Sequence, residues 1–135
     1  MKNLIFTFLI GLFIVSCGSS NKTITNNENL PENAVRIAND TLEYEIIIID
    51  IGFDTYLASI AKPANFYSQS YYETKNKFYV TEWNIRHGQP MRYNPSIYEN
   101  RIDYDFNTDY GLDVNYKLYN YFKFVEYKYK ERFLN

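Results

Sequence analysis

The stretch Asp113-Val-Asn-Tyr-Lys-Leu-Tyr-Asn-Tyr-Phe-Lys-Phe-Val-Glu-Tyr-Lys-Tyr129 decides how this chain folds. Large apolar and aromatic side chains recur in it at the three- or four-residue spacing of an amphipathic helix. They are Val114, Leu118, Tyr121, Phe122, Val125 and Tyr129. The other faces carry lysines that crowd toward the C-terminal end, where the helix dipole favours cations. The sequence therefore predicts a long helix that buries one face in the core.

A second helix is predicted over residues 70–87. Ser70 fits the first position of a capping box, and Ser68 is a rival cap. A stripe at helical spacing follows, made of Tyr71, Tyr72, Lys75, Phe78, Tyr79 and Trp83. Glu82 and Arg86 stand four residues apart, which predicts an ion pair on the solvated side. Many of the aromatic residues are concentrated in these two helix stripes.

Two stretches favour β-structure. Residues 42–50 contain four successive isoleucines, and β-branched residues favour strands. The run is apolar on both faces, which predicts a strand that is central or covered by helices. Residues 98–110 alternate between apolar side chains and a polar row, which predicts a strand or an extended hairpin arm. The polar row is Asp103, Asp105, Asn107 and Asp109.

The expected fold class is α+β. A short helix over residues 55–61, capped by Asp54, is predicted between the isoleucine strand and the second helix. These elements describe a small helix-dominated domain with one or two strands covered by about three helices. A chain of 135 residues, 46% of them hydrophobic, suits one globular domain. We expect that domain to occupy residues 39–135.

The N-terminal segment carries the features of a bacterial lipoprotein. Lys2 precedes an apolar run over residues 4–15 that is too short to span a bilayer comfortably. The run ends in Ile14-Val-Ser-Cys17, which resembles a lipobox, whose cysteine receives diacylglycerol and becomes the mature N-terminus. A buried thiol and cleavage at another position are the alternatives. We expect residues 1–16 to be a signal peptide and Cys17 to be the lipid-attachment site.

A flexible tether is predicted to follow the lipid-bearing cysteine, over residues 17–38. This stretch is rich in Ser, Asn and Thr and contains few apolar side chains, so burial cannot offset the entropy of ordering it. Gly18 rather than Asp follows the cysteine. By resemblance to lipoprotein sorting signals, this favours the bacterial outer membrane, on its periplasmic face. The membrane would then be a partner of the protein through its N-terminal lipid.

Composition excludes several classes of function. Loss of Lys2 with the signal peptide leaves 13 basic against 16 acidic groups, and this balance argues against a nucleic-acid partner. One Cys and one His exclude a disulfide framework and a multi-thiolate zinc site. The sequence has no Gly-rich phosphate loop and no G-x-S-x-G motif. We therefore expect no cofactor, and a non-enzymatic module that binds an envelope protein or a glycan or serves envelope assembly.

The alternating acidic row also resembles the first half of an EF-hand calcium loop. Short oxygen ligands at every second position can converge on a hard cation, and the candidates are Asp103, Asp105, Asn107 and Asp109. The match fails at the sixth position, which is Thr108 rather than Gly, and at the twelfth, which is Val114 rather than Glu. The alternative is a solvated strand face that binds no metal.

Tyrosine accounts for 15 of the 135 residues. Its apolar ring and polar tip suit half-buried positions, glycan stacking and protein interfaces, and most of the tyrosines are expected to fill the core. A possible ligand surface consists of Trp83, Glu82, Tyr116, Tyr119 and Tyr127. An alternative function is a glycan- or peptidoglycan-acting enzyme that uses Glu82 with an Asp of the 103–109 strand, Asp103 or Asp105.

Five separated motifs occur in order along the second half of the chain. They are Tyr67-Ser-Gln69, Tyr79-Val-Thr-Glu-Trp-Asn84, Ile102-Asp-Tyr104, Asp109-Tyr-Gly111 and Leu118-Tyr-Asn-Tyr-Phe122. Together they resemble a family of small lipoproteins of Bacteroidota whose domain has no known function. The resemblance covers roughly residues 44–134. It implies a lipobox-anchored single domain, and it transfers no catalytic role because the family carries no assigned activity.

Overall fold

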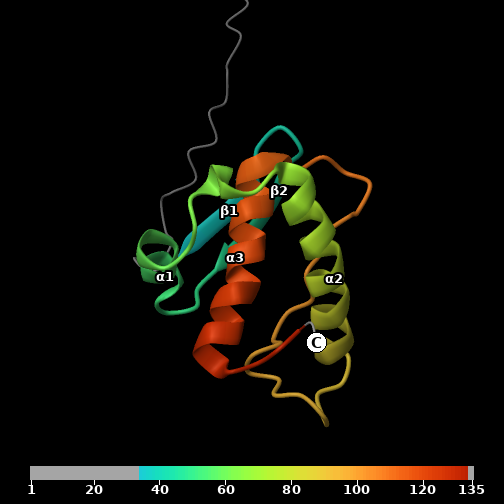
Figure 1. The fold of residues 1–135 in the computed structure, drawn as a ribbon. Helices are drawn as coiled ribbons and strands as arrows, with labels where there is room; N and C mark the ends of the chain where they lie inside the picture. The colour runs from blue at the N-terminus through green and yellow to red at the C-terminus, as the bar shows by residue number, and fades with distance from the viewer. Residues whose placement is uncertain (1–33, 134–135) are drawn as a thin grey trace, which may run out of the picture.

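The computed structural model describes residues 34–133 (Figure 1). Its elements in chain order are β1 (Val35–Asn39), β2 (Tyr44–Ile48), α1 (Phe53–Ser59), the 3-10 turn η1 (Ala64–Phe66), α2 (Gln69–His87) and α3 (Gly111–Tyr129). Three helices and a two-stranded antiparallel sheet make a small, helix-dominated α+β domain. The predicted fold class is confirmed.

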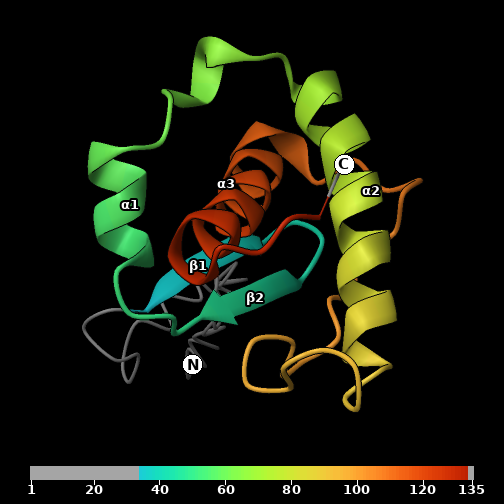
Figure 2. The ribbon, with the colours of Figure 1, turned by 60° about the horizontal axis from the view of Figure 1, so that its bottom comes forward.

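Helix α3 lies at the centre of the domain. It runs between α1 and α2, and the β1–β2 hairpin covers a third side (Figure 2). The predicted face is the buried one, since Val114, Leu118, Phe122 and Val125 are each at most 1% exposed. The helical spacing therefore places its apolar residues against every neighbouring element, as predicted.

The N-cap of helix α2 is Ser68, the alternative to Ser70. The Ser68 hydroxyl accepts a hydrogen bond from the backbone N–H of Tyr71 at 3.2 Å, so the helix starts one residue before Ser70. Tyr72, Tyr79 and Trp83 are buried on its inner face, as the stripe predicts. The same stripe is wrong at Phe78, which is 54% exposed.

The hairpin extends the domain toward the N-terminus. Strand β1 pairs with β2 in antiparallel register from Val35 opposite Ile48 to Asn39 opposite Tyr44. The predicted tether over residues 17–38 therefore overlaps a strand, and the domain includes residues from Val35 onward instead of from residue 39. Strand β1 is stabilised by its pairing with β2, and its five residues are too short a stretch to be recognised as a strand from the sequence alone. The signal peptide, Cys17 and the rest of the tether lie outside the described residues.

Only one face of the sheet is buried. Ile37 and Ile48 are at most 8% exposed and point toward α3, whereas Ile47 is 42% and Ile49 is 56% exposed. The prediction of a strand buried on both faces is wrong, because within residues 34–133 the sheet has two strands and helices cover only its inner side.

Residues 98–110 form no strand, and the predicted alternation holds only in part. Ile102 and Tyr104 are buried and Asp103 and Asp105 are exposed, but Phe106, on the predicted apolar face, is 47% exposed. At Ile102 the side chain of Asn84 makes the backbone hydrogen bonds that a neighbouring strand would otherwise make. The Asn84 amide donates to the backbone oxygen of Ile102 and accepts from its N–H, both at 2.9 Å.

Helix α1 begins at Phe53, two residues before the predicted start. Its N-cap is Gly52 with φ at 95°, a left-handed conformation that glycine adopts readily. The Asp54 carboxylate lies in the first turn instead of capping it, where it still complements the helix dipole. Phe53 is fully buried, and its ring centroid lies 5.4 Å from that of Tyr121.

Replacing Phe122 by Ala should lower the free energy of unfolding by about 3–5 kcal/mol. The side chain is fully buried, and its ring stacks on Tyr79 with centroids 5.1 Å apart. The matched control is Phe78→Ala, which should change stability by less than about 0.5 kcal/mol because that side chain faces solvent. Chemical denaturation followed by circular dichroism measures both. Equal losses in the two variants would contradict this placement of the core face.

Candidate functional site

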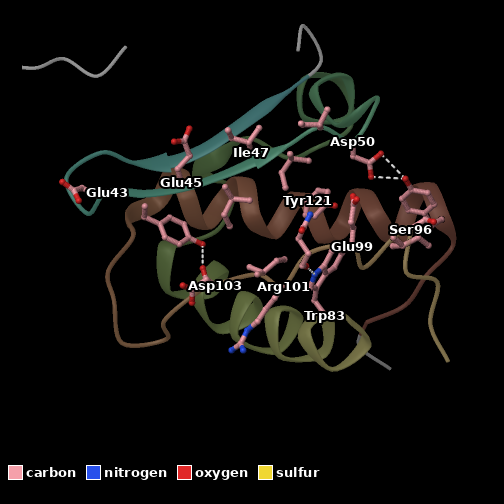
Figure 3. Close-up of a pocket in the computed structure, with 18 residues that line it drawn as sticks. Glu43, Glu45, Ile47, Asp50, Trp83, Ser96, Glu99, Arg101, Asp103 and Tyr121 are labelled. Carbon is pink, nitrogen blue, oxygen red and sulfur yellow. Dashed lines mark hydrogen bonds between the residues drawn. The ribbon is translucent and has the colours of Figure 1, made fainter. Parts of the chain in front are cut away.

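A groove lies beside β2 (Figure 3). Strand β2 forms one wall and residues 96–103 form the other. Trp83 from α2 and Tyr121 from α3 lie at its floor. Its volume is about 640 Å³, which falls in the range of ligand-binding clefts. We call it the β2 groove.

One wall of the β2 groove is the free edge of a strand. Strand β2 pairs with β1 along its other edge only. In an antiparallel strand the backbone groups of alternate residues point to opposite edges. Within residues 34–133 no N–H or C=O of residues 45–49 has a hydrogen-bond partner on the groove side. The groove is therefore lined by backbone donors and acceptors that are available to a ligand.

The opposite wall is fixed by side chains of α2. The Trp83 indole N–H donates to the backbone oxygen of Asn100 at 2.8 Å, and Asn84 holds both backbone groups of Ile102. These bonds fix the position of an irregular segment that has no strand beside it within residues 34–133. The wall is therefore held in place by contacts with α2.

Side-chain hydrogen bonds close the two ends of the groove. At one end the Tyr44 hydroxyl donates to the backbone oxygen of Asp103 at 2.8 Å, and at the other the Tyr129 hydroxyl lies 3.1 Å from both oxygens of Asp50 (Figure 3). Lys128 also contacts the Asp50 carboxylate. At ~3.3 Å per residue, the span between the two ties is about 20 Å.

The β2 groove is acidic. Five carboxylates line it, and Arg101 is the one cation among its lining residues. The carboxylates are Glu43, Glu45, Asp50, Glu99 and Asp103. Glu45 pairs with Arg36 at 2.6 Å and Asp50 pairs with Lys128. The other three have no ion pair in the part of the chain that the structure describes, so the groove presents uncompensated negative charge.

A second polar centre surrounds Arg86 and is structural. The guanidinium is 8% exposed and pairs with Glu82 at 2.8 Å and Glu131 at 2.9 Å. It also donates to the Tyr98 hydroxyl at 2.8 Å and to the backbone oxygen of Arg132 at 2.5 Å. The prediction of a solvated pair is wrong for the arginine, because this side chain joins α2 to the C-terminal segment inside the domain.

The structure does not gather the residues predicted as a ligand surface. Trp83 is 3% exposed at the floor of the groove, whereas Tyr127 is 56% exposed on α3 and lines a different hollow. Tyr116 is half-buried and donates to the backbone oxygen of Lys62 at 2.9 Å. Tyr119 is half-buried against Tyr71, Tyr72 and Tyr79. They serve separate packing roles.

The structure also does not bring together the two carboxylates that a glycosidase needs. Glu82 is held by Arg86, and none of the described grooves is lined by Glu82 together with any acidic residue of the 103–109 segment. The glycan-acting alternative therefore gains no support from the geometry.

Two of the acidic side chains predicted as calcium ligands, Asp105 and Asp109, instead accept hydrogen bonds from nearby groups of the protein. The Asp105 carboxylate accepts from the N–H of Asn107 at 2.9 Å, and this bond lowers its pKa. Asp109 accepts from the N–H of Gly111 at 3.0 Å and from the Gln69 amide at 2.6 Å. Across residues 34–133 no three His, Cys, Asp or Glu side chains gather as metal ligands.

Sequence analysis missed most of the groove. Glu99 and Arg101 drew no attention, although they belong to the same alternation as the buried Tyr98 and Ile102 and therefore had to face outward. Ile47 was expected in the core. Its exposure depends on which edge and face of β2 are covered, and no local pattern of a four-isoleucine run gives that information.

Replacing Arg86 by Met should lower the free energy of unfolding by about 3–5 kcal/mol, because it leaves Glu82 and Glu131 partly buried without their cation. Arg92→Met is the matched control. Because Arg92 is exposed, this substitution should lower the free energy of unfolding by less than about 0.5 kcal/mol. Urea denaturation of the two variants measures the difference. A mild effect at Arg86 would show that the C-terminal segment is held by other contacts.

Alkaline pH should destabilise the domain. Burial raises the pKa of Tyr98 and of Tyr104 to about 12, whereas a tyrosine in the unfolded chain ionises near pH 10. The folded state keeps these protons longer, so its advantage is complete below pH 10 and is lost as the pH rises through 12. Denaturation at pH 9, 10 and 11 should show a falling free energy of unfolding. A value constant over this range would contradict the burial of both hydroxyls.

No helix within residues 34–133 is long and apolar enough to cross a membrane. No curated protein matches the chain, and no solved structure matches it. A family model described as a family of unknown function matches residues 4–135, nearly the whole sequence. The resemblance to a family without an assigned activity is confirmed at that level, and the chain belongs to this family of unknown function, DUF6146.

Proposed function

We propose that the protein is a lipid-anchored, non-enzymatic binding or assembly module of the bacterial outer membrane, on its periplasmic face. The observation that carries the binding role is the β2 groove, whose wall is a strand edge that is unpaired within residues 34–133 and lies beside carboxylates that have no ion pair in that range. Ile47 and Ile49 stand exposed along the same strand. Exposed apolar side chains beside free backbone groups favour a site that takes up another polypeptide.

The anchoring role rests on the lipobox-like sequence before Cys17. In this proposal the lipid enters the membrane and residues 17–34 connect it to β1. The flexible tether that the sequence predicts would, at this length, have an end-to-end distance of about 23 Å. The groove would then work within a few nanometres of the membrane surface, where envelope partners are concentrated.

A photo-crosslinking amino acid at position 47 tests the proposal in cells that make the full-length chain. We expect a crosslinked product in the membrane fraction, because Ile47 is exposed beside the groove. The matched control carries the same amino acid at position 60, where Ile60 is 50% exposed but does not line the groove. No product at 47, or equal products at 47 and 60, would contradict a binding role for this surface.

The Cys17→Ala variant tests the anchor separately. The chain has one cysteine, so loss of metabolic labelling with an alkyne fatty acid identifies the attachment site without ambiguity. We expect the variant to leave the membrane pellet. An unchanged distribution between pellet and supernatant would contradict the anchor and would leave the crosslinking result to stand by itself.

A further inference from the structure

We propose that the β2 groove binds an extended, Lys- or Arg-bearing segment of a partner protein, which pairs with the free edge of β2 as a third strand. This rests on the proposed binding function and names the class of ligand. The three observations that carry it are the free edge of β2, the apolar floor of the groove and the unpaired carboxylates on its walls.

The edge of β2 carries no lysine, proline or bulge, three of the features with which proteins block strand addition. Residues 44–48 contain no Lys and no Pro, and β2 pairs with β1 in continuous register without a bulge. Within residues 34–133 no segment hydrogen-bonds to this edge. An incoming strand would find backbone donors and acceptors already in place.

The length of the groove fits one short strand. A strand added to a sheet lies ~4.8 Å from its neighbour and rises ~3.3 Å per residue, so the span of about 20 Å between the two end ties accommodates about six residues. Alternate side chains of that strand would face the floor, where Trp83 and Tyr121 present aromatic surface. The segment should therefore place apolar residues at every second position.

Charge selects the partner. Glu43, Glu99 and Asp103 are unpaired within the described part of the chain, and Arg101 is the one cation among the lining residues. A cationic segment gains from these carboxylates, and an acidic one is repelled. A second copy of this chain is disfavoured as the occupant for the same reason, because edge-to-edge pairing would bring two acidic grooves together.

A six-residue peptide that alternates Lys with Val is the probe, added to the purified full-length chain. Trp83 is the only tryptophan and lies at the floor of the groove, so its fluorescence reports binding at this site. We expect saturable binding that weakens as salt is raised. A peptide alternating Glu with Val should not bind. The Lys/Val peptide with every backbone nitrogen methylated should bind at least about tenfold more weakly, because neither of its edges can then donate hydrogen bonds to a strand.

Two double variants separate the groove from the total charge. Glu99→Gln with Asp103→Asn should weaken binding of the Lys/Val peptide by about fivefold to tenfold. Asp54→Asn with Asp113→Asn removes the same charge from surfaces outside the groove and should change binding by less than about twofold. All four positions are exposed, and denaturation curves confirm that both proteins are folded.

Three results would overturn the proposal. Equal binding of the methylated peptide would show attraction by charge alone, without strand pairing. Self-association of the chain that Ile47→Lys abolishes would make a second copy the occupant. Failure of the Lys/Val peptide to bind, while the crosslink at position 47 persists, would refute the cationic strand and leave the binding function intact. Loss of both signals would refute the binding function as well.

Discussion

The whole domain depends on the buried face of α3, on which Leu118, Phe122 and Val125 are fully enclosed. Helices α1 and α2, the turn η1 and strand β1 all contact this helix. A domain of about 100 residues has a small core, and here one helix supplies its centre. The positions of the groove floor and walls follow from that packing, since Tyr121 of α3 and Trp83 of α2 meet at 5.6 Å between ring centroids.

Tyrosine serves this fold as a core residue that also makes hydrogen bonds. The Tyr44 hydroxyl donates to the backbone of residue 103, and the Tyr116 hydroxyl donates to that of residue 62. Tyr98 is 2% exposed and contacts the Arg86 guanidinium. Each ring contributes burial while each hydroxyl satisfies a backbone or side-chain group that no sheet or helix satisfies. The abundance of tyrosine therefore reflects the many irregular segments that must be held.

The helices could be predicted from sequence, and the groove could not. Periodicity identified the face of α3 because burial on that face is set by local spacing. It failed over residues 98–110, where the alternation breaks at the exposed Phe106 and the backbone of Ile102 is hydrogen-bonded by the Asn84 side chain instead of by a strand. It also missed β1, whose stability depends on pairing with β2. The free edge of β2 is a property of topology, since it depends on which segments lie beside the strand and not on the strand's own residues.

A free edge built from isoleucines carries a risk of pairing with identical chains. In this domain carboxylates flank the apolar run, with Glu43 and Glu45 at its start and Asp50 at its end. Acidic residues in these positions oppose the approach of a second copy, since like charges would face each other across the new pair. Glu43 has no ion pair within residues 34–133, and together with Glu99 and Asp103 of the opposite wall it favours a cationic strand. The acidic lining of the groove thus both opposes self-association and selects what can occupy the edge.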